Sequence, residues 1–66
     1  MPDSTRHHIK RCNDQAMFHL SEAITNLVKA GHNFDGVHPV IYDKYSFIVS
    51  ALEQTKTTVK MLNDEI

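Results

Sequence analysis

The second half of the chain carries an apolar pattern that restricts it to one kind of structure. From residue 41 onward, apolar side chains and one threonine recur in steps that alternate between four and three residues: Ile41, Tyr45, Ile48, Leu52, Thr55, Val59, Leu62 and Ile66. This spacing is that of a coiled-coil seam, whereas a strand would need alternation with a period of two. The pattern predicts a helix over residues 39–64. Pro39 suits its first position, with His38 or the Asp35-Gly36 turn as the cap.

A second amphipathic segment lies before it. The same steps are followed by Ile9, Asn13, Ala16, Leu20, Ala23, Leu27 and Ala30, and the stripe is widened by Met17, Ile24 and Val28. This pattern predicts a helix over residues 4–30. Asp3 or Ser4 is expected to cap its start, and Gly31 to adopt the left-handed conformation just past its end.

The only break in these patterns is the stretch between residues 31 and 39, which contains both glycines of the chain. Two helices of equal length with a short connection are expected to form an antiparallel hairpin, so the fold class is all-α. With the connection centred near Phe34, the numbers of facing residues should add up to about 69. Ile24 should then meet Tyr45, and Asn13 should lie level with Thr55.

A hairpin of 66 residues has too little core to be stable by itself, and disulfides, metals or partner chains are the usual remedies. The only cysteine, Cys12, cannot form an internal disulfide, which favours a reducing compartment. We expect a homodimer in which two hairpins form a four-helix bundle, and a compact monomer with its loop folded over the hairpin is the alternative. The expected seam of the core and dimer is Leu20, Ile24, Leu27, Ile41, Tyr45, Ile48, Leu52, Val59 and Leu62.

Several classes of function have little support. No apolar run approaches the roughly 18 residues that span a bilayer, and the first residues do not resemble a signal peptide, so we expect a cytoplasmic protein without a membrane partner. Seven Lys and Arg against eight Asp and Glu create no overall field for nucleic acid. No glycine-rich loop or other catalytic motif is present. The sequence therefore predicts a non-enzymatic protein with no catalytic residues and no cofactor.

Five histidines raise the possibility of a metal site. His8 and Cys12 are four residues apart on one helical face, but His19 lies about 16 Å of helix rise from His8. His32 and His38 flank the connection. No recognised zinc spacing occurs, so we predict no metal ligand, with metal-dependent assembly as an alternative.

One basic cluster is a candidate for binding anions: Arg6, Lys10 and Arg11. In a dimer the cluster would occur twice, and a nucleic-acid-binding regulator is the corresponding alternative function. Antiparallel pairing is expected to bring Asp64 and Glu65 next to it and to neutralise part of its charge. No aromatic residues are interleaved for stacking on bases, which further disfavours this alternative.

Phe18 is the residue that points to a protein partner. It lies about 160° from Leu20 on a helical wheel, on an otherwise polar side of the helix. The predicted partner-binding residues are Phe18, Asp14 and Glu22 on the first helix and Phe47 and Met61 on the second. We therefore expect a small protein-binding regulator, adaptor or inhibitor that acts as a homodimeric helical bundle.

Overall fold

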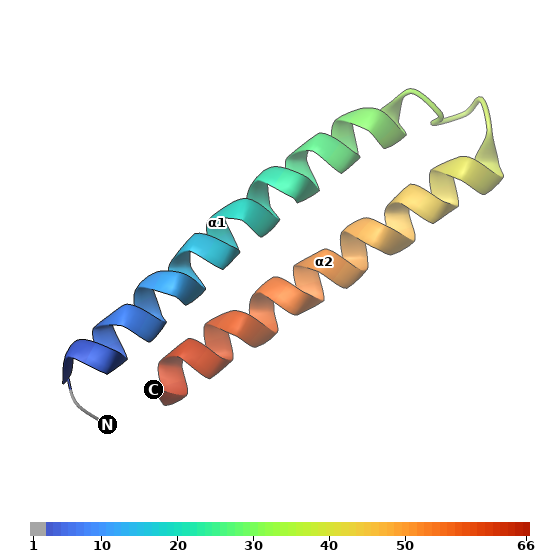
Figure 1. Ribbon diagram of the computed structural model, residues 1–66. Helices are drawn as coiled ribbons and strands as arrows, with labels where there is room; N and C mark the ends of the chain where they lie inside the picture. Colours follow the sequence, from blue (N-terminus) through green and yellow to red (C-terminus); the bar gives the residue numbers. More distant parts are fainter. Residues whose placement is uncertain (1–2) are drawn as a thin grey trace.

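The computed structural model describes residues 3–66 and shows two antiparallel helices side by side (Figure 1). α1 spans Asp3–His32 and α2 spans Pro39–Glu65. The molecule measures 53 × 16 × 10 Å, so it is a rod one helix pair thick. The predicted all-α hairpin is confirmed, with helix limits within two residues of those expected. Met1, Pro2 and the side chain of Asp3, and with them the predicted cap at Asp3, lie outside what the structure describes.

The connection between the helices continues the direction of α1 before it reverses. The Phe34 N–H donates to the Gly31 carbonyl at 2.9 Å, and the Asp35 N–H donates to the His32 carbonyl at 3.3 Å. These bonds between residues three apart form tight helical turns beyond the end of α1. The chain then turns at Gly36, the glycine with positive φ (72°). The prediction for Gly31 was therefore wrong, because Gly31 lies inside α1.

The start of α2 agrees with the prediction. His38 is the N-cap residue, and its Nδ1 atom accepts a hydrogen bond of 3.3 Å from the Ile41 N–H. Pro39 occupies the first turn of α2. Backbone N–H groups in the first turn have no acceptor within the helix, so the N–H that proline lacks costs no hydrogen bond there.

Two contacts fix the register of the helices. The Asn13 side-chain amide donates a hydrogen bond of 3.1 Å to the Asn63 side-chain oxygen. At the other end, a Cβ atom added to Gly31 would lie 2.9 Å from the Cβ atom of Tyr45. In both pairs the residue numbers add up to 76, not to about 69. The predicted levels of Asn13 with Thr55 and of Ile24 with Tyr45 were therefore wrong.

The shift of seven residues has a visible cause. Because the connection carries the chain onward before it reverses, α2 begins beyond the end of α1, and α1 extends past α2 at the other end (Figure 1). Arg6 consequently lies beyond the last turn of α2. By the same register Lys10 is level with Ile66 and Arg11 with Glu65, but within residues 3–66 no direct ion pair joins the basic cluster to Asp64 or Glu65.

The half-buried side chains show which rows of the two helices face each other. On α1 this contact row comprises Lys10, Asn13, Met17, Leu20, Ile24, Leu27, Gly31 and Phe34. On α2 it comprises Tyr42, Tyr45, Val49, Leu52, Lys56, Val59, Asn63 and Ile66. Ile48 and Leu62 of the predicted seam remain exposed. Among the described residues only Gly31 is buried, and no hydrophobic side chain is.

Over the described residues, neither helix combines the length and the apolar character that crossing a bilayer requires.

Candidate interaction surfaces

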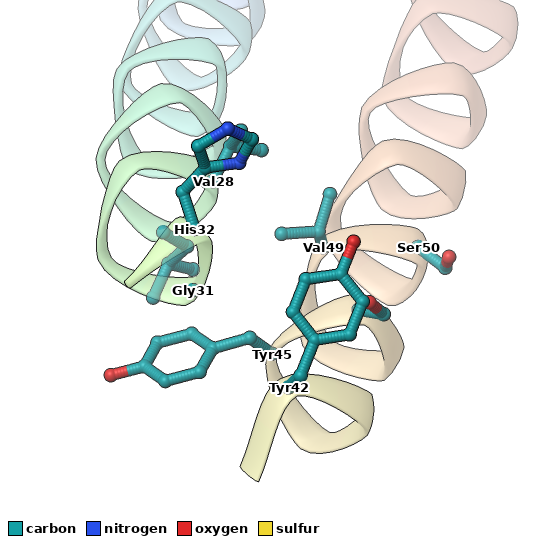
Figure 2. A pocket seen from close by; sticks show the side chains of 9 residues that line it. Val28, Gly31, His32, Tyr42, Tyr45, Val49 and Ser50 are labelled. Atoms are coloured by element: carbon teal, nitrogen blue, oxygen red, sulfur yellow. The ribbon is translucent and has the colours of Figure 1, made fainter. Parts of the chain in front are cut away.

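One broad side of the hairpin, here called the grooved face, is mainly polar. A groove of ≈ 260 Å³ opens on it between the helices, near the connection. Figure 2 shows Val28 and His32 of α1 across this groove from Val49 of α2, and Ser50 is a further lining residue. Residues seven apart lie on the same side of a helix in such a pair. The borders of the grooved face are therefore Asp14, Ser21 and Val28 on α1 and Ser46, Glu53 and Lys60 on α2.

The opposite side of the hairpin, here called the apolar face, has a different composition. It is formed by the other borders of the two contact rows: Ile9, Ala16, Ala23 and Ala30 on α1 and Ile41, Ile48, Thr55 and Leu62 on α2. Ile48 is 44% exposed and Leu62 is 50% exposed. No charged residue belongs to this set. The apolar stripes seen in the sequence are thus wider than the contact between the two helices. Within this set Ala16, Ile48, Thr55 and Leu62 are exposed, and Ile9, Ala23, Ala30 and Ile41 are half-buried.

The threonine hydroxyls on and beside the apolar face are already hydrogen-bonded, so burying this face would not leave them without a partner. The Thr55 hydroxyl donates to the Ala51 carbonyl at 2.9 Å, and the Thr58 hydroxyl donates to the Gln54 carbonyl at 3.0 Å. Covering a hydroxyl that is already bonded leaves no unsatisfied polar group, which would otherwise cost about 1–3 kcal/mol.

A third set of apolar side chains lies on the side of α2 that is directed away from α1. Val40, Phe47 and Met61 are spaced by multiples of seven residues in the same row as Gln54. They are 60%, 76% and 60% exposed. Val40, Phe47 and Ile48 also line a shallow hollow on this helix. Phe47 and Met61 were predicted partner residues, whereas Val40 was missed, although its spacing of seven from Phe47 is a signal for the row.

Phe18 projects from the outer side of α1 and is 59% exposed. Its ring meets the His19 ring edge-on, with centroids 5.5 Å apart, and His19 Nδ1 lies 3.8 Å from Glu22 Oε1. Phe18 and Glu22 line one hollow. Asp14, one turn before Phe18, does not line this hollow and accepts a hydrogen bond of 3.3 Å from the Asn63 side-chain amide. The structure thus brings two predicted partner residues of α1 together and places Phe47 and Met61 on the other helix.

The candidate metal ligands are only partly brought together. The His8 Nε2 and Cys12 Sγ atoms lie 3.8 Å apart on the exposed side of α1. In the part of the chain that the structure describes, no group of three or more potential ligands gathers. Arg6, Lys10 and Arg11 lie within two turns near the start of α1, and by the observed register only Arg6 lies beyond the level of Ile66.

Comparisons of the chain with protein-family models, with curated proteins and with solved structures find no match.

Proposed function

We propose that the chain forms a homodimeric four-helix bundle and acts by binding another protein, as a non-enzymatic regulator, adaptor or inhibitor. The observation that carries this proposal is the missing core: none of the described hydrophobic side chains is buried in the single hairpin. A two-helix layer covers each helix on one side only, and the uncovered sides need a second layer. The apolar face supplies a continuous surface for it.

The total exposed surface of the hairpin supports the proposal that a second copy of the chain covers the apolar face. The hairpin exposes 5123 Å². A folded monomer of 7.6 kDa is expected to expose about 4,300 Å² from the scaling of surface with mass. The excess of about 800 Å² is similar to the area that each partner contributes to a stable interface. A second copy would bury the Ile48 and Leu62 side chains without any further component.

The residues that such a dimer leaves uncovered support binding to a further protein. In a four-helix bundle built on the apolar face, Phe18 and the row of Val40, Phe47 and Met61 would lie outside the core. Exposed aromatic residues and methionine are enriched at protein interfaces and contribute strongly to their affinity. We place the partner-binding surface there, and we place the protein in the cytoplasm, where an exposed thiol such as Cys12 stays reduced.

Retention of a partner by immobilised protein tests this function. We expect the unmodified chain to retain a specific protein from a cell extract, identified by mass spectrometry, and the variants Phe18→Ala and Phe47→Ala to retain much less. Glu53→Ala is the control, because Glu53 is exposed on the grooved face, outside the row of Val40, Phe47 and Met61. All variants must keep their helical circular dichroism and molecular mass. If both aromatic variants retained as much of the protein as the control does, Phe18 and Phe47 would not belong to a partner-binding surface.

A further inference from the structure

The apolar face has a pattern of small and large side chains that bears on how two copies fit together. On its α1 half, Ala16, Ala23 and Ala30 repeat every seven residues and form a row of small side chains. On its α2 half, the large side chains Ile48 and Leu62 stand out. Each hairpin therefore presents a trough along one helix and a ridge along the other.

The ridge and the trough have matching levels along the hairpin. In the observed register, Ile48 is level with position 28 of α1 and lies two residues from Ala30. By the same register, Leu62 lies two residues from Ala16. Two residues correspond to about 3 Å of helix rise. Thr55 is likewise two residues from Ala23. Each of the three successive α2 residues of the face therefore lies near the level of an alanine of α1.

We infer that the two hairpins of the dimer proposed above lie with their connections at the same end, so that α1 of each copy packs against α2 of the other. This inference rests on the proposed dimer. A two-fold axis parallel to the helices keeps every residue at its own level and places α2 of the second copy over α1 of the first. Ile48 of the second copy then enters the trough at Ala30, and Leu62 of the second copy enters it at Ala16.

The opposite arrangement fits the face less well. A two-fold axis perpendicular to the helices places α1 over α1 and α2 over α2, with the connections at opposite ends. The alanine rows would then face each other, while the ridge of Ile48 and Leu62 would meet the same ridge of the second copy. Helical layers pack densely when large side chains face small ones, and both voids and crowding destabilise them.

Distances between spin labels distinguish the two arrangements. Val37 lies in the connection and is 76% exposed, which makes it a suitable labelling site. We would label Val37→Cys in a Cys12→Ser background and measure the label-to-label distance by pulsed electron paramagnetic resonance. Connections at the same end predict about 15–25 Å, from interaxial distances of 8–10 Å plus the label arms. Connections at opposite ends predict about 40 Å or more, because α2 has 27 residues.

The control label is Thr25→Cys in the same background. Thr25 is exposed near the middle of the paired helices, so its distance changes little between the two arrangements. The mass of each labelled sample separates the two claims. A dimeric mass with a short Val37 distance supports the inference, and a dimeric mass with a long one overturns it while the proposed dimer stands. A monomeric mass overturns the proposed dimer, and the inference with it.

Discussion

Asn13 and Asn63 are joined by a side-chain hydrogen bond of 3.1 Å across fifty positions of the chain, and Asn63 also donates to Asp14 at 3.3 Å. This polar layer lies in the contact rows near the free ends of the hairpin, next to the layer of Met17 and Val59. A polar pair in an apolar seam restricts register, because a register in which the two hydrogen-bonding groups face each other is favoured over one that places them opposite apolar side chains.

We expect Asn63→Ala to lower the free energy of unfolding by about 1 kcal/mol, because it removes both of these hydrogen bonds at a half-buried position. Chemical denaturation monitored by circular dichroism measures the effect. All samples need the same protein concentration, since the stability of an oligomer depends on it. Gln15→Ala, on the exposed outer side of α1, is the control and should change little. An unchanged midpoint for Asn63→Ala would show that the layer contributes no stability.

Gly31→Ala is expected to destabilise the hairpin although alanine is the better helix former. The substitution alone would favour the helix by about 1 kcal/mol. The added Cβ atom, however, would lie 2.9 Å from Cβ and 3.1 Å from Cγ of Tyr45 on α2. These two atoms are at the base of the Tyr45 side chain, so a rotation of its flexible end would not relieve the clash. We expect a net loss of about 1–3 kcal/mol from overpacking. Thermal unfolding checks this, and a melting temperature above that of the unmodified chain would contradict the close approach.

His38→Ala is expected to cost about 0.5–2 kcal/mol, because the His38 ring accepts a hydrogen bond from the first turn of α2. His38→Asn should retain most of the stability, since asparagine is among the preferred N-cap residues. Comparing the two variants by denaturation separates capping from other roles of the imidazole. Equal losses for the two variants would show that another property of the ring matters.

Ile48→Asp is expected to abolish dimerisation, because it places a charge in the centre of the apolar face without a partner. Ser46→Asp adds the same charge to the same helix on the grooved face, and we expect it to remain dimeric. Light scattering coupled to size-exclusion chromatography measures both masses. If both variants stayed dimeric, the dimer interface would lie elsewhere on the hairpin.

The sequence was sufficient for the helices but not for their register. The seam and Pro39 located α2 and its cap correctly, since these depend on local pattern and side-chain chemistry. A shift of seven residues, however, leaves a heptad pattern unchanged, so periodicity alone does not distinguish the observed register from the predicted one. What decides between them is the backbone of the connection, where tight turns run to Asp35 and the chain reverses at Gly36.

The exposed apolar side chains were predictable to a similar extent. Phe18 was recognisable because its side of the helix is otherwise polar. Ile48 and Leu62 were recognised as apolar seam residues, but the pattern did not show that they border the contact between α1 and α2. The stripe of α2 is wider than one helix can cover, and only the packed hairpin reveals which half stays exposed.

We propose that one copy of the chain lacks a core and that a second copy supplies it. The molecular mass in solution at micromolar concentration, from sedimentation equilibrium or light scattering, tests this most directly. We expect twice the chain mass of 7.6 kDa, with the helical signal and the dimeric mass lost together on dilution. A folded, helical species with a mass of 7.6 kDa would contradict it.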